Sequence, residues 1–132
     1  MFITQEADYA VRIVSCLARS NQRVDAGYIS EQTGVSLRFA LKILRKLVAS
    51  GIAKSYKGRS GGYELAKTPA ETTLCEVIET VDGPFALSRC LLSDRHDCAH
   101  VAPGCCAFRD VYAEISEQIS AKLREVTFER LI

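Results

Sequence analysis

No apolar run in this sequence of 132 residues approaches the roughly 20 residues that a membrane-spanning helix requires. The first residues, Met1 to Glu6, lack the basic and then apolar layout of a secretory signal peptide. The chain also lacks a nucleophile–base motif and a phosphate-binding loop of the usual spacing. These absences predict a cytoplasmic protein with no membrane partner, and they give an enzyme little support.

Acidic residues are absent from residues 32–63, although the chain has 16 of them and a net charge of only +1. The cations in this stretch are Arg38, Lys42, Arg45, Lys46, Lys54, Lys57 and Arg59. A local basic block on a nearly neutral protein is typical of a surface that binds nucleic-acid phosphates. A merely solvated basic face is the alternative interpretation.

Apolar residues at helical spacing predict three helices before the first strand, over residues 4–19, 25–33 and 36–50. Thr4, Asp25 and Ser36 are expected to cap these helices, and Gly34 ends the second one. For the third helix we expect a buried face made of Phe39, Ala40, Ile43, Leu44 and Leu47. Two short helices joined by a turn that contains glycine are typical of a helix-turn-helix.

Residues 52–66 follow the pattern of a strand, a glycine-rich turn and a second strand, which predicts a hairpin. Thr73 and Glu76 form a capping box that opens a fourth helix. A long apolar stripe near the C-terminus comprises Phe108, Val111, Tyr112, Ile115, Ile119, Leu123 and Val126. A stripe of this length, late in a small protein, predicts a dimerisation helix.

The predicted fold is mainly α with a small β-hairpin, namely a winged helix-turn-helix followed by a long C-terminal dimerisation helix. We divide the chain into a DNA-binding domain at residues 1–84, a cysteine-rich sensor loop at residues 85–106, and the dimerisation helix with a C-terminal turn at residues 107–132. The second helix of a helix-turn-helix enters the major groove of duplex DNA. The predicted DNA-binding residues are Ser36, Arg38, Lys42 and Arg45 on the helix and Lys57, Arg59, Ser60 and Gly61 on the hairpin.

Four of the six cysteines fall within 17 residues, namely Cys90, Cys98, Cys105 and Cys106. Seven residues separate Cys90 from Cys98 and seven separate Cys98 from Cys106, so the two close pairs of a zinc site are absent. Three spread thiols suit an iron–sulfur cluster, with Cys105 as the alternative third ligand. A fourth ligand must come from elsewhere, and the candidates are His96, His100, Asp8 and Glu6.

Other interpretations of the cysteines stay open at this point. They could form a thiol redox switch without a metal, or belong to a chain that has lost its cluster. Cys16 and Cys75 lie within amphipathic helices, where small core residues are expected rather than ligands. An electron-transfer or cluster-carrier protein is a further alternative, but it leaves the basic helix and hairpin unexplained.

Several segments occur in a characteristic order along nearly the whole chain. They are Asp8-Tyr9-Ala10-Val11-Arg12, Gly34-Val35-Ser36, residues 41–47, Lys57 to Tyr63 with Leu65, Val81-Asp82-Gly83-Pro84, Arg89-Cys90 and Thr127-Phe128. In these segments the sequence resembles the family of winged-helix repressors that includes the iron–sulfur assembly regulator IscR and the nitric-oxide sensor NsrR. The resemblance implies a homodimer that binds palindromic or semi-palindromic promoter DNA, with a cluster on three loop cysteines that tunes this binding.

By the same resemblance, the cluster ligands are Cys90, Cys98 and Cys106, with Cys105 as an extra thiol. Where IscR-like members have a histidine three residues after the third cysteine, this chain has Arg109, whose guanidinium stays protonated. NsrR-like members use an acidic residue from the first helix of the partner subunit, and Asp8 falls on that position. The cysteine spacing is longer than in either named member, so two-iron and four-iron clusters both stay open. The implied signals are nitric oxide or oxidants, which would release repression.

Overall fold

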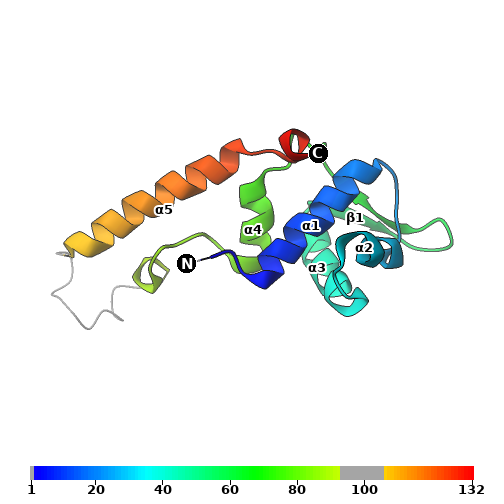
Figure 1. The fold of residues 1–132 in the computed structure, drawn as a ribbon, viewed down its shortest axis with the longest axis horizontal. Helices are drawn as coiled ribbons and strands as arrows, with labels where there is room; N and C mark the ends of the chain where they lie inside the picture. The colour runs from blue at the N-terminus through cyan, green and yellow to red at the C-terminus, as the bar shows by residue number, and fades with distance from the viewer. Residues whose placement is uncertain (1, 93–105) are drawn as a thin grey trace.

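The computed structural model describes residues 2–92 and 106–132. Its elements in chain order are α1 (Gln5–Ser20), α2 (Ala26–Thr33), α3 (Leu37–Ala49), β1 (Ala53–Tyr56), β2 (Gly62–Leu65), α4 (Leu74–Asp82), η1 (Arg89–Leu91), α5 (Ala107–Glu125) and η3 (Phe128–Leu131). The two strands form one hairpin and the other described elements are helical, as Figure 1 shows. The predicted class, mainly α with a small β-hairpin in a winged helix-turn-helix, is therefore confirmed.

The helices begin where the sequence predicts, because side chains satisfy their first free backbone N–H groups. The side chains of Thr4, Asp25 and Ser36 accept hydrogen bonds from the backbone N–H three residues later, at 3.1, 2.7 and 3.4 Å. Thr73 and Glu76 form the predicted capping box at the start of α4. All four predicted caps are therefore confirmed.

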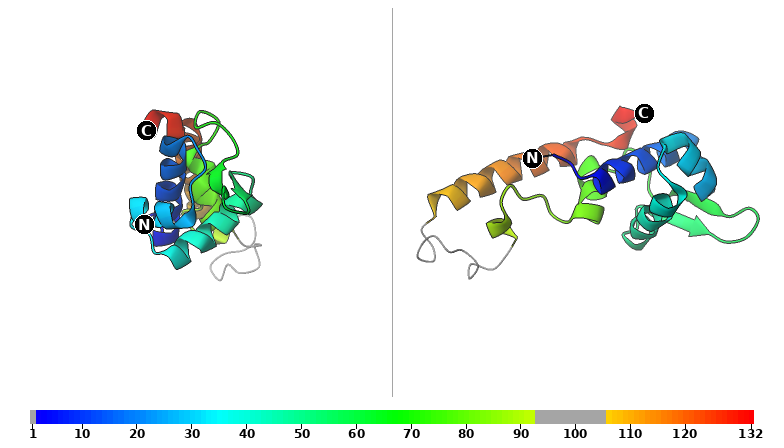
Figure 2. Two further views of the ribbon diagram at one scale, coloured as in Figure 1. Left: turned by 90° about the vertical axis from the view of Figure 1, so that its right-hand side faces the viewer. Right: turned by 60° about the horizontal axis from the view of Figure 1, so that its bottom comes forward.

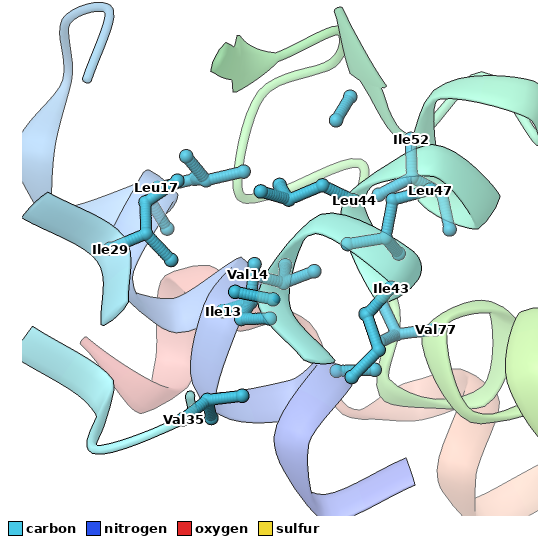
Figure 3. Close-up of a cluster of buried hydrophobic side chains, with 14 of the residues drawn as sticks. Ile13, Val14, Leu17, Ile29, Val35, Ile43, Leu44, Leu47, Ile52 and Val77 are labelled. Carbon is cyan, nitrogen blue, oxygen red and sulfur yellow. The ribbon is translucent and has the colours of Figure 1, made fainter. Parts of the chain in front are cut away.

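One hydrophobic core lies between α1, α2, α3 and α4 (Figure 3). Its fully buried members include Ile13, Val14, Ile29, Val35, Ile43, Leu44, Leu47, Val77 and Phe128. α1 is central to this core, since it packs against α2, α3, α4 and η3. Phe128 on η3 packs into the core and so holds the C-terminal residues against it. Burying a side chain of this size stabilises the fold by about 2 kcal/mol. The predicted final helical turn is confirmed.

Phe39 does not belong to the buried face of α3, contrary to the prediction, because 49% of the residue is exposed. The other four predicted residues, Ala40, Ile43, Leu44 and Leu47, are fully buried. At about 100° per residue, Phe39 lies roughly a quarter turn from the centre of that face. Its ring lies instead near the ring of Tyr9 on α1, with 6.1 Å between the ring centres.

The hairpin is antiparallel, with Ala53 opposite Leu65 and Tyr56 opposite Gly62. Val24, in the connection between α1 and α2, forms a further antiparallel bridge with Tyr63 through two backbone hydrogen bonds of 3.0 and 2.8 Å. No sequence pattern predicts this bridge, because its two residues are far apart along the chain. It ties the hairpin to the start of the helix-turn-helix.

α5 extends from the winged-helix core as an arm, and η1 packs beside the end at which α5 begins (Figures 1 and 2). The buried residues of α5 are Ser116 and Ser120, and Ser116 Oγ accepts a hydrogen bond from the backbone N–H of Leu87 at 2.9 Å. Much of the predicted apolar stripe is exposed, with Phe108 73% and Val111 51% accessible. Within residues 2–92 and 106–132, none of the helices has the length and apolar character to span a membrane.

Candidate nucleic-acid interface and cysteine site

The outward face of α3 carries the predicted cations. Arg38, Lys42 and Arg45 are exposed, and helix periodicity places them opposite the buried residues. A surface hollow of about 640 Å³ over this face is lined by Arg38, Phe39, Leu41, Lys42 and Arg45. Ser36 is exposed at the start of the helix, where its hydroxyl oxygen already accepts the capping hydrogen bond. The face therefore combines positive charge with a concave surface.

Glu6 of α1 reaches the same helix and offsets part of its positive charge. Its Oε1 atom lies 2.7 Å from Lys46 Nζ and 3.6 Å from Lys42 Nζ. The hydrogen bond from Lys46, more than any other contact, lowers the pKa of Glu6 below its usual value. Sequence patterns do not reveal this contact, because the fold alone brings residue 6 to α3. Glu6, a candidate fourth ligand, is thus engaged with two lysines.

The tip of the hairpin is exposed at Lys57, Arg59 and Ser60. Gly61 is half-buried, and its N–H closes the turn by donating to the carbonyl oxygen three residues earlier at 3.0 Å. A Cβ atom at Gly61 would lie 2.3 Å from the carbonyl oxygen of Tyr56, so glycine alone fits there. Gly61 therefore shapes the turn that presents the other three side chains.

A cation that the sequence prediction missed lies at the end of β1, next to the turn of the hairpin. Arg23 lies over the ring of Tyr56, with 3.4 Å from its Cζ atom to the ring centre. Tyr56 Oη donates to Glu64 Oε1 at 2.6 Å, and this hydrogen bond raises the pKa of Tyr56. No sequence signal links Arg23 to the hairpin, because the neighbouring bridge of Val24 brings the two together.

Two of the predicted cluster ligands lie where η1 meets α5. Cys90 belongs to η1, Cys106 immediately precedes α5, and both are free, half-buried thiols. Arg109 links the two elements, since its Nε donates to the carbonyl oxygen of Cys90 at 3.3 Å. The Cys90 thiol donates to Ser88 Oγ at 3.2 Å. Because neither thiol is in a disulfide, both could bind the iron of a cluster as thiolates.

The other predicted ligands from the loop, Cys98 and Cys105, lie outside the described residues, as do the candidates His96 and His100. In the part of the chain that the structure describes, no three Cys, His, Asp or Glu side chains gather closely enough to bind a metal. The described residues therefore supply part of a donor set.

Asp8 lies in the first turns of α1 and forms an ion pair with Arg12 at 2.9 Å. About half of each side chain is exposed, so the pair is open to solvent. An apolar groove of about 590 Å³ beside it is lined by Phe2, Ile3, Gln5, Asp8, Val11, Leu74 and Leu131. Asp8 is therefore accessible from outside the subunit.

The two remaining cysteines behave as packing residues, as the sequence predicts. Cys75 is buried in α4, and Cys16 on α1 packs against the core while half-buried. Burial raises the pKa of both thiols, so both favour the protonated form.

Comparison with known sequences gives matches along nearly the whole chain. The Rrf2 family, described as iron-dependent transcriptional regulators, matches residues 3–132. An rrf2-like HTH-type transcriptional regulator of Rhodobacter capsulatus is 32% identical over 139 residues, which cover 98% of this chain and 91% of that protein. The HTH-type transcriptional regulator IscR of Photorhabdus laumondii is 29% identical over 134 residues, covering 100% of this chain and 79% of that protein.

Two solved structures share the fold. CymR of B. subtilis, described as its global cysteine regulator, aligns with a TM-score of 0.78 at 22% identity, covering 99% of this chain and 95% of that one. IscR of T. potens aligns with a TM-score of 0.77 at 20% identity, covering 99% of this chain and 85% of that one. With the sequence match over residues 3–132, these findings show that the chain belongs to the Rrf2 family of transcriptional regulators.

Proposed function

We propose that this protein is a cytoplasmic, homodimeric DNA-binding repressor whose affinity for promoter DNA is set by an iron–sulfur cluster. The observation that carries the DNA-binding part is the outward face of α3. There Arg38, Lys42 and Arg45 share one exposed surface, and the exposed hairpin tip adds Lys57 and Arg59. Cations arranged in this way match the charge of duplex DNA.

In this proposal α3 enters the major groove and the hairpin tip contacts the backbone or the minor groove. Arg38 and Arg45 have planar guanidinium groups that can donate two hydrogen bonds to a guanine or a phosphate. Lys42 acts as a point charge, and Ser36 and Ser60 offer hydroxyl groups. Neutralised phosphates release counterions, so binding is expected to weaken steeply as salt rises.

The proposed partner subunit is a second copy of this chain. Phe108, Val111 and Ile115 are exposed along α5, an arrangement that is unusual for a helix without a partner. The apolar groove beside Asp8 is a second unpartnered surface. If α5 of one subunit lay along the start of α1 of the other, both surfaces would be buried together.

We propose that Cys90, Cys98 and Cys106 hold the cluster, with Cys105 as the alternative third thiol and the partner subunit's Asp8 as the fourth ligand. The support is the packing of η1 on α5, which gathers Cys90 and Cys106 at one end of the arm as free thiols. When bound, the cluster supplies a redox-active centre that nitric oxide or oxidants can attack. A carboxylate ligand is labile, which suits a sensor whose signal displaces a ligand.

A series of contacts connects the end of α4 to α3, and the chain continues from the end of α4 to Cys90. Asp82 ends α4 just before residues 83–92, and its Oδ1 accepts a hydrogen bond from Thr4 Oγ1 at 2.7 Å. Thr4 caps α1, and Glu6 in the same turn binds Lys46 of α3. A rearrangement around Cys90 would therefore shift the start of α1 and change the spacing of the two α3 helices in a dimer. DNA affinity depends steeply on that spacing.

The cluster is tested by measuring iron and acid-labile sulfide, with a visible absorption spectrum, on protein purified without oxygen. We expect near-stoichiometric iron and sulfide with charge-transfer bands. In Cys90→Ala and in Cys106→Ala, the iron, the sulfide and the bands should be lost. Cys16→Ala is the matched control and should retain them. Iron-free protein that resists reconstitution would contradict the cluster. If Asp8→Ala changed neither cluster content nor the response to nitric oxide, Asp8 would not be a ligand.

A second candidate is a regulator of the same fold without a cluster, which senses thiol oxidation or a protein partner. It is favoured by the free thiols of Cys90 and Cys106, because thiols that bind no metal are open to oxidation. This candidate predicts that oxidation changes DNA affinity in iron-free protein. An electron-transfer or cluster-carrier protein is a weaker alternative, and it predicts no salt-dependent binding to duplex DNA.

A further inference from the structure

Leu41 lies on α3 beside the cations but does not pack into the core. The residue is 38% exposed, and it is not among the partly buried side chains that contact the core. Helix periodicity places it on one flank of the outward face, next to Arg38 and Arg45. Phe39 lies on the opposite flank, where the ring of Tyr9 lies close to it. The hydrophobic core therefore does not account for a leucine at position 41.

The surroundings of Leu41 indicate what this leucine could contact. Together with Arg38, Lys42 and Arg45, it lines the hollow over the outward face of α3. The cations are complementary to phosphates and to guanine, so they would hold α3 within the major groove of duplex DNA. Along the base edges of that groove, the apolar group available to an aliphatic side chain is the C5-methyl group of thymine.

We infer that Leu41 packs against the C5-methyl group of a thymine and thereby selects an A·T pair at one position of each half-site. This inference rests on the proposed function, because α3 must enter the major groove. It adds a base preference that the cations alone do not give, since their strongest base contact is with guanine.

The experiment begins with selection of duplexes from a randomised pool by the full chain, purified without oxygen. Each thymine of the selected site is then replaced in turn by uracil, which removes only the methyl group. For the wild-type protein we expect one position at which uracil lowers the affinity about four-fold. Leu41→Ala should bind the thymine site about four-fold more weakly and lose nothing further with uracil at that position.

Leu37→Ala is the matched control, because Leu37 is a second exposed leucine of α3 that lies outside the hollow. In Leu37→Ala, uracil at the position assigned to Leu41 should lower the affinity as much as it does in the wild-type protein. Alanine favours helix and Leu41 is partly solvated, so Leu41→Ala is expected to fold, which circular dichroism checks. The inference would be overturned if Leu41→Ala showed the wild-type response to uracil, or if the selected sites had no thymine. Neither result would contradict the proposed DNA-binding function. If no sequence were enriched and binding did not depend on salt, the proposed function itself would fail.

Discussion

Glu6 Oε1 on α1 lies 2.7 Å from Lys46 Nζ on α3, and the same oxygen lies 3.6 Å from Lys42 Nζ. Lys42 belongs to the face that we propose binds DNA, so a carboxylate and a phosphate would compete for its charge. Thr4, two residues before Glu6, is bound to Asp82 at the end of α4. The charge that α3 offers to DNA is therefore coupled to the position of α1.

Replacing Glu6 with glutamine removes this competing charge and frees both lysines for phosphates. We expect affinity for duplex DNA to rise roughly two- to five-fold, in keeping with the modest strength of exposed ion pairs. The plot of log affinity against log salt should become steeper by up to about one unit. Fluorescence anisotropy across a salt series measures both quantities. Glu114→Gln, on the exposed surface of α5, removes the same charge elsewhere, and an equal gain in that variant would contradict a local effect.

The same carboxylate predicts how stability depends on pH. The hydrogen bond from Lys46 lowers the pKa of Glu6 in the folded state below the usual 4.5. The resulting stabilisation is fully present above the unfolded pKa and disappears as the pH falls through the lowered folded value. Wild type should therefore be more stable than Glu6→Gln by up to about 1 kcal/mol near neutral pH, with a smaller difference in acid. Urea unfolding at a series of pH values measures this, and a difference that stays constant into acid would argue against the ion pair.

The local features of the fold were predictable because neighbouring residues determine them. Thr4, Asp25, Ser36 and the Thr73–Glu76 capping box bond to amides within their own turns, so composition and spacing were sufficient. The winged-helix class followed from the order of these elements. Phe39 was misplaced because it borders the apolar stripe of α3, and the sequence does not show that Ile43 and its neighbours define the centre of that face.

Contacts between distant segments were not predictable in this way. The Val24–Tyr63 bridge and the Glu6–Lys46 ion pair join residues that only the folded chain brings together. The predicted DNA-binding side chains are exposed on α3 and the hairpin, but the sequence alone did not single out Leu41. Of the four cysteines in residues 85–106, the structure describes Cys90 and Cys106, so the complete ligand set stays a prediction.

The hairpin is expected to be sensitive to a methyl group at Gly62. Gly62 has a φ of 138°, and a Cβ atom there would lie 2.6 Å from the carbonyl oxygen of Val24. Gly62→Ala should destabilise the protein by more than about 1 kcal/mol and weaken DNA binding, because the hairpin must shift away from Val24. Thermal unfolding and anisotropy measure the two effects. Gly27→Ala in α2 is the control, since its added methyl group meets only the side chain of Asp25. An unchanged melting temperature in Gly62→Ala would show that the hairpin tolerates a methyl group at this position.

Thiol labelling should distinguish the buried Cys75 from the half-buried Cys90. Burial raises the pKa of Cys75, so little reactive thiolate forms near neutral pH. In metal-free folded protein we expect iodoacetamide to label Cys75 roughly tenfold more slowly than Cys90, as followed by mass spectrometry of digested peptides. The two rates should converge in urea, where burial is lost. Equal rates in the folded protein would show that Cys75 is not protected.

In the proposed mechanism, one molecule couples a cluster at Cys90 and Cys106 to DNA binding by α3. The most direct measurement is the affinity of a single oxygen-free preparation for its selected duplex, before and after nitric oxide disassembles the cluster, with iron loss followed in the same sample. We expect the affinity to fall at least roughly tenfold in step with the loss of iron, within the range typical of allosteric coupling. Full loss of iron with unchanged affinity would contradict it.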